Sequence, residues 1–243
     1  MDILTFDDFI NLPMSNSKAY ILGLLLPKIV ISRSNENNKH YVTGQINHGY
    51  QNKPEDSDIM AHYISLNKFF LNEKINIEIL FNNQLKSFSQ NTLRFISLRG
   101  IGFAVCFPID NSKIINFSSA NINNNLYNNI RKTLISQVNK ITQKHAPYFL
   151  AATIDGRSSV DTTLKCVSLD IDTDNNLNTS LRYITEDLLN MDINLNDRTG
   201  RSDSTRMNQL RYKEDSVKDF FRLHSNIIFS KFRRNKIEEI IIR

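Results

Sequence analysis

The sequence has no tryptophan and only two cysteines, Cys106 and Cys166, among its 243 residues. Neither cysteine belongs to a CxxC pair, so we expect neither a disulfide framework nor a structural zinc site. We expect the protein to reside in a reducing compartment. Glycine and proline are also scarce, at 7 and 5 residues, and no Gly-rich or Pro-rich linker divides the chain. The length therefore predicts one large domain or two lobes packed closely together.

Long apolar runs are absent as well. The two longest, residues 20–31 and 101–109, are shorter or more interrupted than the roughly 20 residues that cross a bilayer. The first thirteen residues contain Asp2, Asp7 and Asp8 and have neither the basic start nor the apolar core of a secretion signal. We expect an intracellular protein, in the cytoplasm, nucleoid or an organelle matrix, without membrane contact.

The charge is moderately positive, with a net value of +5. Such an excess alone predicts little beyond solubility. Its distribution is more informative, because basic residues gather in one polar segment (Arg198, Arg201, Arg206, Arg211 and Lys213) and again near the C-terminus (Lys231, Arg233, Arg234 and Lys236). Clusters of this kind are candidate phosphate contacts.

Apolar periodicity predicts helices that alternate with pairs of strands. In the first part of the chain we predict helices at 18–26, 55–71 and 126–141, and strands at 29–33, 41–46, 75–81, 93–98 and 102–107. In the second part we predict helices at 146–154, 177–189, 215–223 and 227–241, and strands at 164–171, 193–196 and 207–212. The recurring order suggests a repeat, with one lobe at 1–141 and another at 142–243.

Two segments with small residues at matching places carry the strongest motif. They are AYILGLLLPKIVIS at 19–32 and PYFLAATIDGRSSVD at 147–161. Gly23 and Ala152 occupy equivalent positions, and Pro27 and Gly156 follow them four residues later. Small residues at these positions would let two helices approach closely.

These segments resemble the two motifs of the single-chain LAGLIDADG homing endonucleases. The second is the closer match, since Leu150, Ala151, Ile154, Asp155 and Gly156 stand in the expected places, whereas the first keeps chiefly Gly23. The resemblance implies an α+β fold made of a pseudo-two-fold pair of αββαββα lobes. It also implies that the motif helices pack at the centre and that curved antiparallel sheets form a DNA-binding saddle in the major groove.

The resemblance also points to a degenerate active site. The family places a metal-binding acid at the eighth motif position, where this sequence has Lys28 and Arg157. A cation cannot ligate magnesium, which takes oxygen ligands, so strand cleavage by the family mechanism is expected to fail and no cofactor is expected. Two cations at the centre of such a surface suit binding to DNA phosphates.

We therefore predict a non-catalytic protein that binds double-stranded DNA at a specific or modified site, as the recognition subunit of a restriction or defence system would. Relatives of the family include readers of this type. A separate nuclease or motor subunit remains open as a partner. The candidate DNA contacts are Lys28, Arg33, Arg94, Arg99, Arg157, Lys165, Arg198, Arg201, Arg206 and Arg211.

Three alternatives stay open. An active endonuclease would need Mg²⁺ on an atypical site that includes Asp155, although we favour a structural role for this carboxylate, paired with an arginine or capping the next turn. The chain could instead be an RNA-binding, maturase-like splicing factor or a structural component of an RNA-protein assembly. A protein-interaction module is the third alternative. The five histidines show no pair at ligand spacing and are assigned no chemistry.

Overall fold

The computed structural model describes residues 4–27, 29–33, 40–48, 56–73, 75, 78–81, 101–109, 122–171, 175–196 and 208–242. The first half contains α1 (Phe6–Asn11), α2 (Asn16–Leu25), β1 (Val30–Arg33), β2 (His40–His48), α3 (Asp56–Asn72), β3 (Glu78–Phe81), β4 (Ile101–Ile109) and α5 (Ile122–Val138). The second contains α6 (Ala146–Arg157), β5 (Ser158–Asp161), β6 (Cys166–Ile171), α7 (Asn175–Arg182), the π-helix η3 (Tyr183–Leu188), β7 (Ile193–Asn196), β8 (Asn208–Tyr212), α8 (Glu214–His224), the 3₁₀ helix η4 (Ser225–Ile227) and α9 (Lys231–Ile242).

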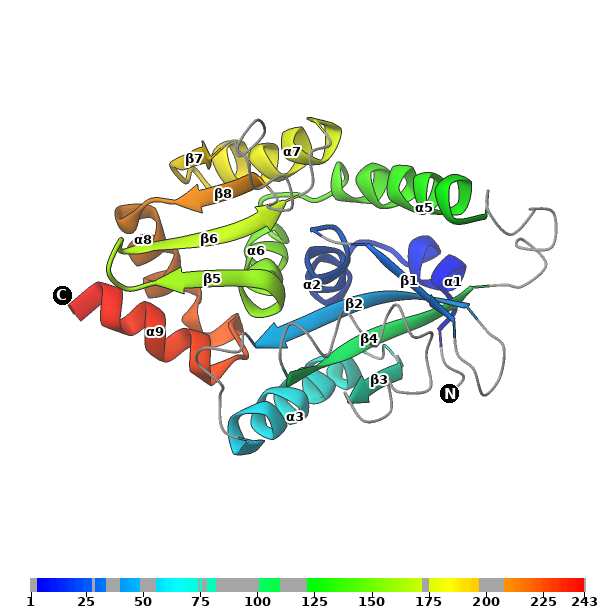
Figure 1. Ribbon diagram of the computed structural model, residues 1–243, viewed down its shortest axis with the longest axis horizontal. Coiled ribbons are helices and arrows are strands. Elements are labelled where there is room, and N and C mark those ends of the chain that lie inside the picture. The colour runs from blue at the N-terminus through cyan, green and yellow to red at the C-terminus, as the bar shows by residue number, and fades with distance from the viewer. Residues whose placement is uncertain are drawn as a thin grey trace, which may run out of the picture.

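Each half forms a four-stranded antiparallel sheet with the same topology. The first has the strand order β1-β2-β4-β3 and the second has the order β5-β6-β8-β7. Figure 1 shows the two sheets at opposite ends of the molecule, with helices between and around them. The predicted α+β class and the recurring order of elements are confirmed, while the lobe boundary at 141 and 142 stays a prediction.

The helices α2 and α6 pack side by side at the centre, between the two sheets (Figure 1). Ser15 caps the start of α2 by accepting a hydrogen bond from the backbone N–H of Lys18, and the helix from Ser17 to Leu25 is buried. A Cβ atom at Gly23 would lie 2.2 Å from the carbonyl oxygen of Phe149 and 2.9 Å from Cβ of Ala152. The close approach expected at Gly23 and Ala152 is therefore present.

Lys18 is buried near the start of α2. Its Nζ donates hydrogen bonds to the carbonyl oxygens of Ile10 and Leu12, at 2.7 and 2.5 Å, and to Oε1 of Gln137, at 3.0 Å. Burial, with a smaller contribution from Lys140, lowers the pKa of Lys18 to about 8. This lysine joins α1 and α5 to the central helix.

Several elements differ from the sequence-based prediction. The helix α1 was not predicted, because its six residues are too few to show a period; Thr5 and Asp8 stabilise it with a capping box. The last helix begins at Lys231 rather than at Ile227, and β5 begins directly after α6. The predicted strand at 93–98 lies outside the described residues. In the described part of the chain, no helix is both long and apolar enough to cross a membrane.

Candidate nucleic-acid interface

The second sheet separates polar from apolar residues by face. Paired residues of neighbouring strands lie on the same face, and successive residues alternate between faces. The register joins Ser159 to Ser168, Ser168 to Arg211, and Arg211 to Asn194, which makes one polar row across all four strands. The next row is apolar and contains Val160, Val167, Tyr212 and Ile193.

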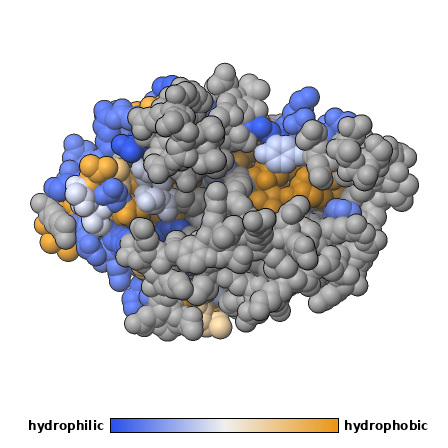
Figure 2. All heavy atoms as spheres, in the orientation of Figure 1, coloured by the Kyte–Doolittle hydropathy of each residue, from blue (hydrophilic) through white to orange (hydrophobic). Residues whose placement is uncertain are grey.

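The two faces have different surroundings. Leu169 and Leu210, on the apolar face, belong to the core with Val217 and Phe220 of α8. On the polar face, Ser159 and Asn194 are exposed, Arg211 and Gln209 are partly exposed, and Ser168 is buried. Figure 2 shows hydrophilic and hydrophobic residues mixed at the left end of the molecule, where α8 and α9 lie beside the second sheet in Figure 1. We call the side of the sheet with Ser159, Asn194, Gln209 and Arg211 the polar face.

Arg211 lies at the middle of the polar face. It forms no ion pair with a described residue, and its Nε is shut off from solvent without a hydrogen-bond acceptor. Because Nε has no accessible surface, a bound acceptor would meet the terminal nitrogens of this partly exposed side chain instead. Serine, asparagine, glutamine and arginine are also the side chains that hydrogen-bond to base edges and phosphates.

The other predicted contacts are not brought together in the described residues. Lys165 lies in the turn between β5 and β6 with a positive φ of 47°, and its Nζ is 3.2 Å from Oε1 of Glu214. Arg33 ends β1 and Arg157 ends α6, immediately before β5. The remaining candidates lie outside the described residues: Lys28, Arg94, Arg99, Arg198, Arg201 and Arg206.

The first sheet offers no comparable face in its described residues. Gly44 of β2 faces α2, since a Cβ there would lie 3.2 Å from Leu24 and Leu25. Residues on the opposite face are buried too, including Tyr41 and Thr43 of β2 and Cys106 of β4. The accessible polar face of the described structure is therefore that of the second sheet.

Asp155, near the C-terminal end of α6, is fully buried, and its hydrogen bonds reach α2, the segment before α9, and α9 itself. Its Oδ2 accepts hydrogen bonds from Tyr20 Oη at 2.6 Å and from the Phe229 backbone N–H at 2.7 Å. Its Oδ1 accepts one from the Ser230 N–H at 3.0 Å, and Arg233 donates to its backbone carbonyl. Burial raises the pKa of Asp155 to about 6, against the opposing effect of these bonds.

This geometry gives Asp155 a structural role. Its carboxylate oxygens already hold α2 and the segment before α9 against α6, and His62 Nε2 of α3 lies 3.9 Å from Oδ2. Sequence reasoning missed Tyr20, His62 and Arg233 because these contacts join residues far apart in the chain. Within the described ranges no three acidic, histidine or cysteine residues gather as a metal site.

Two acidic residues near the second sheet, Asp161 and Glu214, also bind neighbouring groups of the protein. Oδ1 of Asp161 accepts hydrogen bonds from the backbone N–H groups of Thr163 and Leu164, both at 2.9 Å. It therefore shapes the β5–β6 turn in the manner of an Asx-turn. Glu214 accepts from both Lys165 and Lys218.

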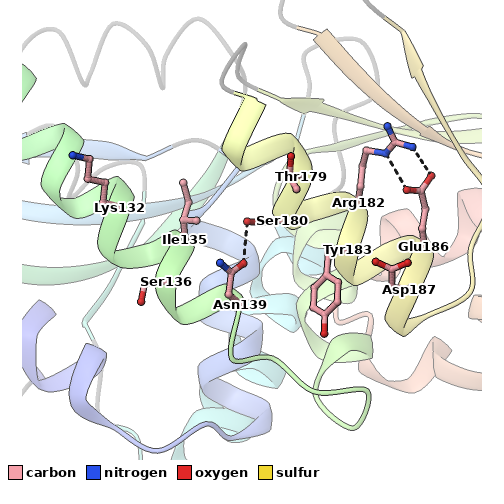
Figure 3. Close-up of a pocket in the computed structure, with 10 residues that line it drawn as sticks. All are labelled: Lys132, Ile135, Ser136, Asn139, Thr179, Ser180, Arg182, Tyr183, Glu186 and Asp187. Atoms are coloured by element: carbon pink, nitrogen blue, oxygen red, sulfur yellow. Dashed lines mark hydrogen bonds and ion pairs between the residues drawn. The ribbon is translucent and has the colours of Figure 1, made fainter.

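A wide groove of about 820 Å³ lies between α5 and the α7–η3 segment (Figure 3). Ser180 donates a hydrogen bond to Oδ1 of Asn139 across its floor, at 3.2 Å. Glu186 is bound by Arg182, at 2.9 Å, and Asp187 lies beside it on the same wall. Lys132 and Arg182 also line the groove, so its two bases balance its two acids and leave no net positive charge to attract phosphates, and the groove is not part of the candidate interface.

No protein-family model matches the sequence, and no curated protein does. Several solved structures are similar. The crystal structure of I-DmoI in complex with DNA and Mn aligns over 88% of this chain and 96% of that chain, with 13% identity and a TM-score of 0.46. The complex of I-DmoI with DNA and Ca aligns over 87% and 88%, with 13% identity and a TM-score of 0.47. Mesophilic variants of the homing endonuclease I-DmoI align over 85% and 86%, with 12% identity and a TM-score of 0.47.

Proposed function

We propose that this chain binds double-stranded DNA without cleaving it, and that the polar face of the second sheet contacts the major groove. The observation that carries the proposal is Arg211, a partly exposed arginine without an ion-pair partner among the described residues, at the centre of a row of serine and asparagine side chains. A sheet of this composition can place donors and acceptors against base edges.

Lys28 and Arg157 belong to the same proposal. Each follows or ends a central helix, and Arg157 directly precedes β5. We place both near the middle of the bound duplex, where their charges would neutralise phosphates. Asp155 would take no part in chemistry, because its carboxylate oxygens hold the central helix in the fold.

The direct test is a binding titration on a pool of random duplexes, with and without magnesium, followed by sequencing of bound and cut molecules. Selective binding without cuts supports the proposal. Magnesium-dependent cuts that Asp155→Asn abolishes would establish the endonuclease alternative. A preference for structured RNA over duplex DNA in competition would establish the RNA-binding alternative instead.

Arg211→Ala is expected to weaken binding to the selected duplex by about 1–3 kcal/mol and to relax specificity at one position of the site. The reason is the loss of the Arg211 guanidinium, which can donate two parallel hydrogen bonds from the centre of the polar face. The measurement is a fluorescence anisotropy titration of wild type and variant on the selected duplex and on its single-base variants.

Arg222→Ala provides the matched control. Arg222 carries the same charge, is exposed on α8, and pairs with Asp219 at 3.4 Å. Because α8 packs on the apolar face, this side chain lies on the far side of the sheet from the polar face. An equal loss of affinity in the two variants would mean that only overall charge matters, and the proposed face would be wrong.

Replacing Lys28 and Arg157 together by glutamate is expected to weaken binding to all sequences and to reduce the slope of log affinity against log salt by about 2, one for each lost phosphate contact. The measurement is affinity at several salt concentrations. An unchanged affinity and slope would remove both residues from the interface.

A further inference from the structure

A second cavity, of about 360 Å³, lies between α3 and the segment that leads into α9. Two cations line it, Lys68 from α3 and Arg234 from α9, together with the amide side chains of Asn72 and Asn226. No carboxylate is among the described residues that line it. Its volume lies within the range of small-molecule binding sites, whose volumes are roughly 300 Å³ or more.

The two cations have no counter-ion in the described structure. Lys68 and Arg234 form no ion pair with a described residue; Nε of Arg234 is buried without an acceptor, so an anion in the cavity would meet the terminal nitrogens of this side chain. Other basic residues nearby do have acidic partners, as Lys231 does with Asp58, at 3.9 Å. The terminal nitrogens of a guanidinium form a fork that is well shaped to bind an oxyanion such as a phosphate.

An aromatic wall adjoins the cations. Phe69 and Phe229 both line the cavity, and their ring centroids are 5.2 Å apart. Phe69 also stacks on Tyr148, with an interplanar angle of 3°. The backbone N–H of Phe229 is held by Asp155, so this wall is fixed before any ligand arrives.

We propose that this cavity binds a phosphorylated small molecule with a flat or apolar group, of the nucleoside monophosphate type. The phosphoryl oxygens would accept hydrogen bonds from Arg234 and Lys68. The flat group would pack on Phe69 and Phe229, and the amides of Asn72 and Asn226 would meet its polar edge. The site is separate from the polar face and does not depend on DNA binding.

The test is calorimetric titration of the full chain with inorganic phosphate and, separately, with AMP. AMP is expected to bind more tightly than phosphate, because only AMP can use the aromatic wall. Lys68→Gln and Arg234→Gln should each weaken AMP binding about tenfold or more. Lys231→Gln removes a charge from the same helix as Arg234 but outside the cavity, and should leave AMP binding unchanged.

Lys68 is exposed on α3, so Lys68→Gln should fold normally even if Arg234→Gln does not. Thermal melting of each variant checks this. The proposal is overturned if AMP binds no more tightly than phosphate, or if both glutamine variants bind AMP as the wild type does. Competition between AMP and duplex DNA would also overturn it, by assigning the two cations to the DNA backbone.

Discussion

Gly23→Ala is expected to destabilise the protein by about 3 kcal/mol or more, against the direction that helix propensity predicts. Alanine is favoured over glycine inside a helix by up to about 1 kcal/mol. At Gly23, however, the new Cβ would lie 2.2 Å from the carbonyl oxygen of Phe149. A backbone oxygen cannot move aside as a side chain can, so α2 and α6 must separate and lose packing along their contact.

The measurement is the free energy of unfolding by urea or guanidinium denaturation, with the melting temperature as a second readout. Gly44→Ala is the matched control, because its Cβ would lie 3.2 Å from Cβ of Leu24 and from Cδ2 of Leu25, contacts that a movement of a few tenths of an ångström would relieve. We expect Gly44→Ala to change stability by no more than about 1 kcal/mol. A stable Gly23→Ala variant would contradict the close helix contact at the centre.

The features that the sequence predicted correctly are local or periodic. Gly23 and Ala152 could be aligned because each lies in a short apolar segment with the same spacing of small residues. The repeated order of helices and strand pairs was visible because apolar residues recur with the period of each element. The six-residue helix α1 had no such period, and its capping pair, Thr5 and Asp8, is a weak signal by itself.

The candidate interface depends on information that one-dimensional patterns do not contain. Arg211 was predicted as a DNA contact from the basic cluster, yet its place at the middle of the polar face follows from its register with Ser168 and Asn194. A shift of one residue would move Arg211 to the apolar face. The bonds of Asp155 to Phe229 and Ser230 are equally invisible in sequence, since 74 and 75 positions separate the partners.

The buried cluster around Asp155 explains why the last helix begins late. The N–H groups of Phe229 and Ser230 are bound by the carboxylate, and the chain turns helical only from Lys231. Arg233 from the first turn of α9 then reaches the carbonyl of Asp155, and burial lowers the pKa of this arginine to about 10. One motif residue therefore positions both the central helix and α9.

Asp155→Ala is expected to destabilise the protein by about 3–5 kcal/mol at pH 7. The change removes a carboxylate that faces the buried charge of Arg233, and it removes the acceptor for Tyr20 and for two backbone N–H groups. The measurement is again the free energy of unfolding. Asp161→Ala is the control, since its turn is exposed and its loss should cost about 1 kcal/mol or less.

Asp155→Asn isolates the pH dependence of this cluster. The pKa of Asp155 is about 6 in the folded protein, whereas the pKa of an aspartate in an unfolded chain is about 3.9. Between these values the folded protein holds a proton that the unfolded chain has lost, so this group's contribution to stability is complete below about pH 4 and falls as pH rises through 6. The difference in unfolding free energy between wild type and Asp155→Asn should therefore decrease by about 2 kcal/mol from pH 4 to pH 7.

Comparing the two proteins cancels the titration of carboxylates elsewhere in the chain. Tyr20, His62 and Arg233 face Asp155 from α2, α3 and α9. Repeating the comparison with His62→Gln in both proteins separates the imidazole from the carboxylate. A difference that stays constant from pH 4 to pH 7 would mean that Asp155 remains ionised throughout, with Arg233 and its N–H donors outweighing the cost of burial.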